Sequence, residues 1–227
     1  LLVKAIVFGA SGALGSEICS ELTNQGFIVV RVSRTEQNGF DLNTSAENWI
    51  ETAQELGPFD AIVWAQGINS AGSILNTSLS SITESFDANV LSIVESLQAL
   101  FAASTLASSC RGVVLSSIWQ DHARGNKLAY MVSKSALSGL IKSVAIDMAE
   151  HGFAINAVLP GVIDTPMTRS MLSQSQIENV EANSLGGKLA NANEVAKTVA
   201  WLAGTSSSGL NAQFLTVDKG WTVKRSV

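Results

Sequence analysis

Cysteine is scarce in this sequence, and the two residues present do not form a metal-binding or redox motif. Cys19 and Cys110 stand far apart, and neither belongs to a C-x-x-C pair or to a Cys/His arrangement with zinc-site spacing. We therefore expect reduced, partly buried thiols rather than a disulfide, and no metal centre.

Charged residues and long apolar runs are also few. Charged residues make up 15% of the 227 positions, and the net charge of −5 provides no basic face for a nucleic-acid backbone. No apolar run approaches the roughly 18 residues of a membrane-spanning helix, and no signal peptide is evident. We expect a cytoplasmic protein that binds neither nucleic acid nor membrane. Because apolar residues reach 46%, we expect a homodimer or homotetramer that covers apolar surface.

Short β-branched apolar runs alternate with stretches of helical periodicity. The predicted strands are Val3–Phe8, Phe27–Val32, Ala61–Ala65, Gly112–Leu115, Ala154–Leu159 and Gln213–Val217. The predicted helices are Ser16–Asn24, Ala46–Leu56, Leu79–Leu106, Leu128–Glu150 and Asn193–Ala203. This alternation indicates one α/β domain over residues 1–227, with a parallel sheet and helices on both faces. Arg34–Phe40 is too short for a crossover helix, so we expect a loop there and a further short strand that ends before Asp41.

A glycine-rich turn joins the first predicted strand to the first predicted helix. Gly9, Ser11, Gly12, Ala13 and Leu14 lie at this junction. Backbone N–H groups and the helix dipole can bind a pyrophosphate in such a turn. The alternative is a tight turn that binds nothing, because glycine patterns of this kind are common.

The end of the second predicted strand bears on the choice between NAD and NADP. Ser33 and Arg34 stand where a carboxylate would bind the ribose hydroxyls of NAD, and a guanidinium there suits a 2′-phosphate. A solvated loop arginine is the alternative. Asp41-Leu42 follows the next short strand, where the carboxylate either accepts a hydrogen bond from an adenine amino group or caps a helix. The pattern favours NADP(H) over NAD(H).

Tyr130 and Lys134 are four positions apart on a predicted helix and therefore share one face. An ammonium beside a phenol lowers the phenol pKa from its ordinary value of about 10, which favours proton exchange near neutral pH. Ser117 adds a hydroxyl at the end of the preceding strand, where open α/β sheets bind ligands. Asn89 lies on the apolar face of helix Leu79–Leu106, where its amide needs partners whether or not it serves catalysis. Taken alone, a Tyr/Lys pair at this spacing is usually a surface contact.

These motifs, together with Pro160-Gly161-Val162-Ile163-Asp164-Thr165 and the closing segment Leu215–Trp221, occur in the order of the short-chain dehydrogenase/reductase family. The sequence resembles that family over nearly its whole length, and most closely its single-domain, 3-oxoacyl-acyl-carrier-protein reductase-like members. The resemblance implies a Rossmann fold, which is a doubly wound, seven-stranded parallel sheet flanked by helices. It also implies a mobile substrate lid over about residues 166–188.

The resemblance further implies an NAD(P)(H)-dependent oxidoreductase that reduces a carbonyl to an alcohol, or the reverse, on a small or carrier-bound substrate. Tyr130 would donate the proton and Ser117 would hold the substrate oxygen. Lys134 would bind the nicotinamide ribose and lower the pKa of Tyr130, while Asn89 would hold a water molecule of the proton relay. The other residues that would contact the dinucleotide are Ala65, Gln66, Gly67, Pro160, Gly161, Ile163 and Thr165.

Two motifs depart from the family pattern. Ala13 stands at the middle glycine of T-G-x-x-x-G-x-G, with Gly12 one place earlier, and Trp64-Ala65-Gln66-Gly67 replaces N-N-A-G. The alternatives to a reductase are a catalytically silent dinucleotide-binding sensor and a sugar-type dehydrogenase, epimerase or dehydratase. The complete Asn-Ser-Tyr-Lys set favours the enzyme, since a sensor does not need the Tyr/Lys chemistry.

The loop between Ser117 and Tyr130 carries Trp119, Arg124 and Lys127. A flat ring with two cations suits a polar or anionic substrate, such as an acyl-carrier thioester or a sugar derivative, better than a steroid-like one. The alternative is that both cations point to solvent or cross a subunit interface.

Overall fold

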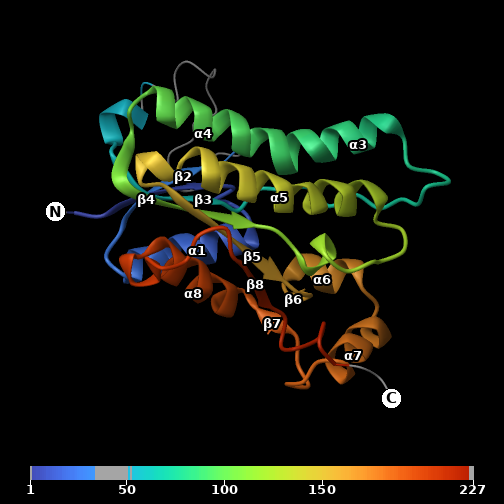
Figure 1. The fold of residues 1–227 in the computed structure, drawn as a ribbon. Coiled ribbons are helices and arrows are strands. Elements are labelled where there is room, and N and C mark those ends of the chain that lie inside the picture. The colour runs from blue at the N-terminus through green and yellow to red at the C-terminus, as the bar shows by residue number, and fades with distance from the viewer. Residues whose placement is uncertain (1, 34–50, 52, 225–227) are drawn as a thin grey trace.

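Six parallel strands form the central sheet in the part of the chain that the computed structural model describes, residues 2–33, 51 and 53–224 (Figure 1). In spatial order they are β2 (Ile28–Val32), β1 (Lys4–Phe8), β3 (Phe59–Trp64), β4 (Leu106–Leu115), β5 (Ala154–Pro160) and β8 (Phe214–Val217). Seven strands were predicted, and the additional short strand expected before Asp41 lies outside the described residues. The strand order reverses between β1 and β3, the point at which doubly wound sheets bind nucleotides.

Alternate residues of each strand face two separate apolar cores. In β1, Ala5 and Val7 belong to one core, whereas Ile6 and Phe8 belong to the other. All seven residues of β5 are buried. Because both faces of the sheet are covered, its strands appear in the sequence as continuous apolar runs rather than alternating ones.

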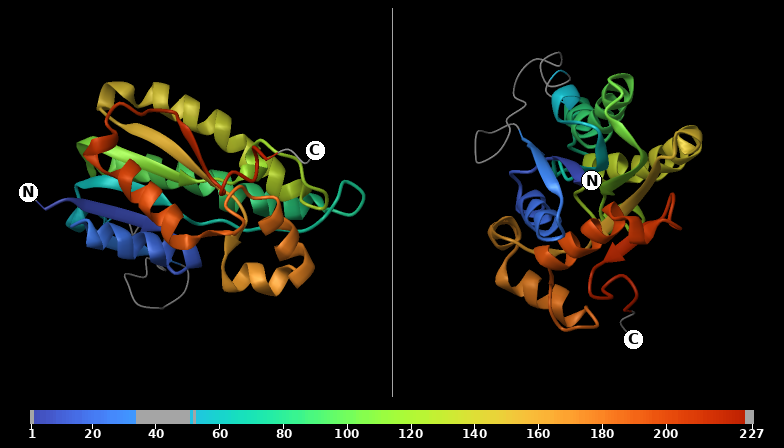
Figure 2. Two further views of the ribbon diagram at one scale, coloured as in Figure 1. Left: turned by 90° about the horizontal axis from the view of Figure 1, so that it is seen from below. Right: turned by 90° about the vertical axis from the view of Figure 1, so that its left-hand side faces the viewer.

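Helices cover both faces of this sheet (Figure 2). The longer ones are α1 (Ala13–Asn24), α3 (Leu79–Phe86), α4 (Ser92–Ala102), α5 (Leu128–Asp147) and α8 (Ala192–Ala203). α1 and α8 pack together against one face, and α4 and α5 cover the other. The predicted helix Ala46–Leu56 lies largely outside the described residues; residues 51 and 53–56 are helical.

The predicted helix Leu79–Leu106 is wrong in two respects. A π-helical turn, η1 (Asp87–Leu91), interrupts it between α3 and α4. The helix then ends at Ala102, and β4 begins at Leu106 rather than at the predicted Gly112. Ser104 explains the end, because its left-handed backbone (φ 55°) turns the chain so that the Thr105 N–H and hydroxyl both donate to the Leu100 carbonyl.

The segment that contains the predicted lid leaves the sheet after β5. Two short strands, β6 (Ile163–Asp164) and β7 (Ala190–Asn191), pair with each other, and the chain between them forms α6 (Pro166–Met171) and α7 (Gln174–Ala182). Thr165 caps α6, as its hydroxyl accepts a hydrogen bond from the Thr168 N–H at 3.2 Å. The segment between β6 and β7 is therefore held at both ends by the pairing of these two strands.

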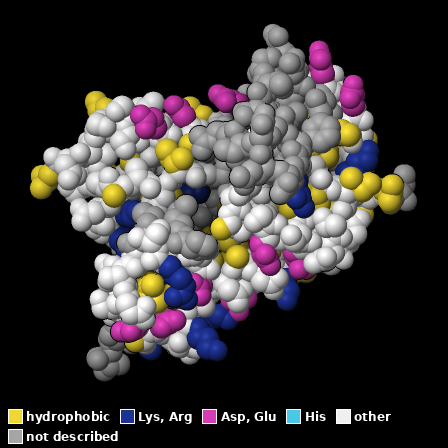
Figure 3. All heavy atoms as spheres, turned by 180° about the vertical axis from the view of Figure 1, so that it is seen from behind, with side chains coloured by type: hydrophobic (Ala, Val, Ile, Leu, Met, Phe, Trp, Pro, Cys, Tyr) yellow, Lys and Arg dark blue, Asp and Glu magenta, His cyan; other side chains and the backbone are white. Residues whose placement is uncertain are grey.

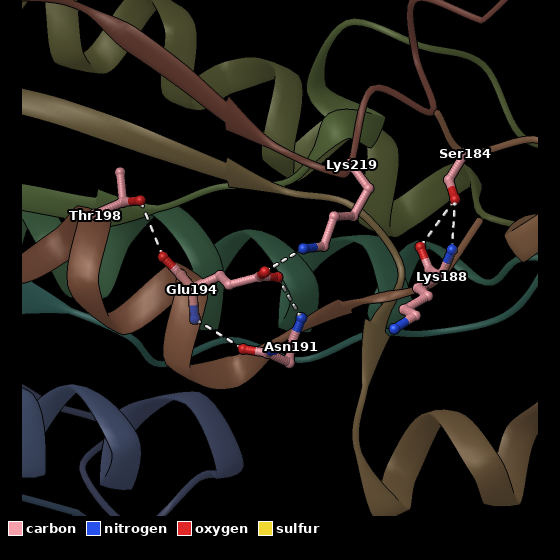
Figure 4. Close-up of polar contacts among 6 residues, drawn as sticks. All are labelled: Ser184, Lys188, Asn191, Glu194, Thr198 and Lys219. Atoms are coloured by element: carbon pink, nitrogen blue, oxygen red, sulfur yellow. Dashed lines mark hydrogen bonds and ion pairs between the residues drawn. The ribbon is translucent and has the colours of Figure 1, made fainter. Parts of the chain in front are cut away.

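A polar network anchors the far end of this segment (Figure 4). Asn191 and Glu194 cap α8 reciprocally, with each side chain accepting from the other residue's N–H at 2.9 and 3.0 Å. Lys219, which follows β8, forms an ion pair with Glu194. Ser184 bonds both backbone groups of Lys188. The ion pair ties the turn after β8 to the start of α8, and the Ser184 bonds hold the turn that follows α7.

The cysteines, the apolar helices and the surface charges bear on the remaining expectations from composition. Cys19 and Cys110 are free and buried, and burial raises their pKa values to about 11 and about 12. Among the described residues no helix is long and apolar enough to cross a membrane, and no group of His, Cys, Asp and Glu side chains is placed to hold a metal ion. Lys and Arg side chains are interspersed with Asp and Glu over the described part of the rear face (Figure 3).

Candidate active site

The turn after β1 is held by two glycines that pack against backbone. Gly9 adopts φ +76°, and a β-carbon on it would lie 2.5 Å from the backbone nitrogen of Gln66. A β-carbon on Gly15 would lie 2.1 Å from the Gly9 carbonyl oxygen. Since no side chain fits at either position, α1 starts directly against the ends of β1 and β3.

Gly12 leaves the N-terminus of α1 open. It is the N-cap residue, and within the described chain no side chain caps this helix and its first turn carries no acidic residue. A β-carbon on Gly12 would meet only the Gly9 carbonyl oxygen, at 3.4 Å, and Ser11, Gly12 and Ala13 are exposed. A helix start with exposed, uncapped N–H groups fits a diphosphate. Because Ala13 is exposed at the first helical position, its departure from the glycine pattern does not obstruct this turn.

The same turn is fixed to the end of β2. The N–H groups of Gly9 and Ala10 donate to the Val32 carbonyl oxygen at 2.8 and 3.1 Å. Ser33 follows immediately, so it lies beside the turn. Arg34, Asp41 and Leu42, the other residues expected near the adenosine half of a dinucleotide, lie outside the described residues.

Ser117 and Tyr130 come together from different elements. Ser117 follows β4 and is buried, with its Oγ accepting from the Trp119 N–H at 3.3 Å. Tyr130 lies in the first turn of α5, and its phenol is close enough to Ser117 for the serine hydroxyl to affect its pKa. Burial raises the pKa of Tyr130, and the neighbouring Ser117 hydroxyl opposes that shift. The phenol is therefore protonated at neutral pH and has a second hydroxyl beside it.

Lys134 lies one turn further along α5 and is 3% exposed. Its Nζ donates to the Leu115 carbonyl oxygen at 2.8 Å and stands 5.8 Å from the centre of the Tyr130 ring. Burial lowers the pKa of Lys134 to about 8. The sequence led us to expect that Lys134 lowers the Tyr130 pKa. In the protein without a dinucleotide, burial of the phenol affects the Tyr130 pKa more than the charge of Lys134 does. The ammonium lies over the ring face and donates to the Leu115 carbonyl group.

Asn89 lies in the π-helical turn and is 1% exposed. Its Oδ1 accepts from the Ile68 N–H at 2.8 Å, and its Nδ2 donates to the Ile68 carbonyl at 3.1 Å and to Ser133 Oγ at 2.8 Å. Ser133 in turn donates to the Tyr130 carbonyl at 2.8 Å. Asn89 thus joins the segment after β3 to the start of α5. Ser133 was missed in the sequence, although its place three residues after Tyr130 on the same helix could have indicated it.

Gln66 carries a buried acceptor that no donor of the described residues reaches. Its Nε2 donates to Ser92 Oγ at 3.2 Å, and the Ser92 hydroxyl proton is used toward the Ala88 carbonyl at 2.9 Å. Ser92 can therefore only accept from Gln66, which fixes the amide orientation. Oε1 of Gln66 is left buried and without a hydrogen-bond partner in the described chain. A ribose hydroxyl is a donor that fits beside this acceptor and the Gly9 turn.

The segment after β5 completes the site edge. Pro160 ends β5, and the Gly161 N–H donates to the Val217 carbonyl at 3.0 Å. A β-carbon on Gly161 would lie 2.6 Å from Cβ of Asp218. Ile163 is buried in β6, and Thr165 caps α6. The described site residues therefore lie at the carboxyl ends of neighbouring strands or in the segments that follow them.

Trp221 is a residue that the sequence argument did not single out. Asp218 accepts from the Gly220 and Thr222 N–H groups, both at 2.8 Å, and so holds the turn that carries Trp221. Trp221 meets Trp119 edge to face, with ring centres 5.6 Å apart. The guanidinium carbon of Arg124 lies 5.2 Å from the centre of the Trp119 ring. An aromatic wall with a cation thus stands beside Ser117.

A doubly wound sheet with an open glycine turn and a Ser, Tyr and Lys set at its carboxyl edge defines the class of dinucleotide-dependent oxidoreductases. Residues 41–222 match the family model described as enoyl-(acyl carrier protein) reductase. The chain is 27% identical to the 3-oxoacyl-[acyl-carrier-protein] reductase FabG of Escherichia coli K12, over 95% of this chain and 96% of that protein. It is 32% identical to the 2-(R)-hydroxypropyl-CoM dehydrogenase of Xanthobacter autotrophicus, over 86% and 78% of the two chains.

A solved structure shows the same fold. The ligand-free aldohexose dehydrogenase of Thermoplasma acidophilum superposes with a TM-score of 0.86 over 99% of this chain and 96% of that chain, at 24% identity. The chain belongs to the short-chain dehydrogenase/reductase family and is an NAD(P)(H)-dependent oxidoreductase acting on a carbonyl or alcohol. The predicted family, fold class and reaction class are confirmed.

Proposed function

We propose that this chain is an NADP(H)-preferring reductase that converts a carbonyl to an alcohol with Tyr130 as the proton donor. The observation that carries the proposal is the grouping of the Ser117 hydroxyl, the Tyr130 phenol and the Lys134 ammonium, whose Nζ lies 5.8 Å from the centre of the Tyr130 ring. A phenol kept protonated by burial suits an acid that gives its proton to a nascent alkoxide. A silent sensor would not need this arrangement.

The chain's own residues would divide the work of the reaction. The dinucleotide, when bound, supplies the hydride. Ser117 and Tyr130 would hold the substrate oxygen and polarise the carbonyl through two hydrogen bonds. Lys134 donates one N–H to the Leu115 carbonyl, which leaves two donors on the ammonium for ribose hydroxyls. Asn89 would keep the segment after β3 in register with α5 and hold a water of the proton relay.

The dinucleotide would bind along the carboxyl edge of the sheet. The residues proposed to contact it are Gly9, Ser11, Gly12, Ala13, Leu14, Ser33, Arg34, Asp41, Leu42, Ala65, Gln66, Gly67, Tyr130, Lys134, Pro160, Gly161, Ile163 and Thr165. The proposed preference for NADP(H) rests on Ser33-Arg34, which places a cation and no carboxylate after β2. Residues 166–188 are proposed to close over the substrate as a lid on a single domain of residues 1–227.

A 3-oxoacyl thioester is a proposed substrate, because the E. coli relative that matches over most of both chains is named as a 3-oxoacyl-[acyl-carrier-protein] reductase. The test is the oxidation of NADPH and of NADH by the purified protein with a panel of carbonyl compounds that includes acetoacetyl-CoA and keto sugars. We expect carbonyl-dependent oxidation, faster with NADPH. Tight dinucleotide binding without turnover of any panel member would instead support the silent sensor.

A further inference from the structure

Arg124 and Lys127 line one groove of about 510 Å³ at the carboxyl side of the sheet. One wall is the segment that follows β3, and the other is the loop that precedes α5. The Gly72 N–H donates to the Asn126 carbonyl at 3.1 Å, and the Leu128 N–H donates to the Gly72 carbonyl at 3.0 Å. The two walls are therefore fixed to each other, and the groove opens immediately before Tyr130.

Among the residues that the structure describes, neither of these two neighbouring cations forms an ion pair. The ion pairs among the described residues are Arg169–Asp164 and Lys219–Glu194, and neither involves this groove. The Nζ of Lys127 donates to the neutral amide oxygen of Asn69 at 2.7 Å. Burial and the charge of Arg124 lower the pKa of Lys127. Two partly buried like charges repel each other, and an anion between them would relieve that cost.

Arg124 is held in place relative to the reacting groups. Its guanidinium stacks on Trp119, and its backbone N–H donates to the Met131 sulfur at 3.3 Å. The Trp119 N–H donates to Ser117 Oγ, and the Trp119 ring is braced by Trp221. A short rigid path therefore connects Ser117 to the guanidinium. Trp119 thus contacts Ser117 at its backbone and Arg124 at its ring, within the one loop that precedes α5.

We propose that Arg124 and Lys127 bind an oxyanion at the far end of the carbonyl substrate, while the Trp119 and Trp221 rings contact its body. This inference rests on the proposed function, because it places the substrate carbonyl at Ser117 and Tyr130. The planar fork of a guanidinium pairs with a carboxylate or a phosphate, and the ammonium adds a point charge beside it. The substrate class is thus an anionic carbonyl compound rather than a neutral ketone.

The test compares 4-carboxybenzaldehyde with its neutral methyl ester, methyl 4-formylbenzoate, in the full-length holoenzyme with NADPH. Arg124→Gln and Lys127→Gln remove one charge each. Lys142→Gln is the matched control, because Lys142 lies on α5 and stacks on Phe214 (5.6 Å) but does not line the groove. We expect the acid to be preferred by kcat/KM, and Arg124→Gln to reduce that preference about tenfold or more. Added salt should reduce the preference for the acid by a larger factor in the wild type than in Arg124→Gln.

Binding is measured separately from turnover by quenching of tryptophan fluorescence. Saturable binding of the acid that weakens in Arg124→Gln supports the inference, whether or not the aldehydes are reduced. Binding of this kind without reduction of either aldehyde would count against the proposed function and not against the inference. Equal kcat/KM for acid and ester, equal losses for both in Arg124→Gln, or an effect of Lys142→Gln of the same size would overturn the inference and leave the carbonyl chemistry in place. Competition by benzoate and by phenyl phosphate then distinguishes a carboxylate from a phosphate site.

Discussion

Gly67 and Asn89 lie so close that a β-carbon on Gly67 would stand 2.8 Å from Oδ1 of Asn89. The same β-carbon would be 3.5 Å from Nζ of Lys134. Asn89 cannot move aside freely, because its amide holds Ile68 and Ser133 through three hydrogen bonds. Gly67, in the segment after β3, is therefore a condition for placing the amide and the ammonium of the site.

The first prediction concerns Gly67→Ala. The added methyl group should displace the Asn89 amide and through it the start of α5, lowering kcat about tenfold or more while the protein remains folded. Steady-state kinetics and circular dichroism on the same samples provide the check. Gly209→Ala is the control, since Gly209 is exposed in the turn before β8 and a β-carbon there meets nothing within 4 Å. Wild-type turnover in Gly67→Ala would show that the Asn89 position is not critical.

Much of the site follows from the sequence, and the reasons for the rest are local. Tyr130 and Lys134 share a face because a helix repeats about every 3.6 residues, and Ser117 ends a strand, so their meeting follows from the fold. The π-helical turn at Asn89 has no comparable signature, and the partners of Asn89, Ile68 and Ser133, stand 21 and 44 positions away in the sequence. Trp221 was likewise missed, because its contact with Trp119 joins the segment after β8 to the segment after β4.

The fold departs from the sequence prediction where a pattern was ambiguous. Leu106 was assigned to the end of a helix because apolar residues continued its stripe. The left-handed Ser104 turns the chain before that point and directs Leu106 into β4. Backbone conformation at one polar residue thus outweighed the periodicity on either side of it.

The second prediction is that Tyr130→Phe lowers turnover by about a hundredfold to ten-thousandfold, because it removes the acid and keeps the ring. Dinucleotide affinity, measured by fluorescence titration, should change little, since Phe retains the packing above Lys134. Near-normal turnover in this variant would reject Tyr130 as the proton donor. A large loss of dinucleotide affinity would instead indicate a binding role.

The third prediction concerns the dinucleotide preference. Arg34→Ala should raise KM for NADPH about tenfold or more, in line with about 1.5–3 kcal/mol for a hydrogen bond to a charged group. KM for NADH serves as the internal control and should change much less, because NADH lacks the 2′-phosphate. Equal effects on both dinucleotides, or a wild-type enzyme that prefers NADH, would contradict the proposed role of Arg34.

The fourth prediction is a homodimer or homotetramer in which the helices of one face pair with their symmetry mates. Leu91 and Phe101 are each 42% exposed and Ile146 is 77% exposed, on the helices α4 and α5 and the turn η1 (Figure 1). Ile146→Glu should weaken the assembly in light scattering at micromolar concentration. Leu2→Glu, at a position 72% exposed near the N-terminus, is the control. A wild-type monomer would refute the prediction.

The last prediction follows from the burial of Lys134, whose pKa is lowered from 10.5 to about 8. The unfolded chain then binds the Lys134 proton more tightly than the folded one, so stability from this group rises with pH between these two values and is lowest below about pH 8. Lys134→Met removes the titrating group. The variant should therefore gain stability relative to the wild type at neutral pH and lose that advantage as the pH rises.

Urea unfolding at about pH 7 and about pH 9.5 measures this difference. One pKa unit corresponds to about 1.4 kcal/mol, so the stability of Lys134→Met relative to wild type should fall by about 2 kcal/mol between the two pH values. The lost hydrogen bond to the Leu115 carbonyl affects both values alike and cancels, as do the raised thiol pKa values of Cys19 and Cys110. Lys142→Met, an exposed lysine on the same helix, should show no such fall. If the two variants behave alike, the ammonium of Lys134 is paired or hydrated in the folded enzyme, and its charge is not disfavoured by burial.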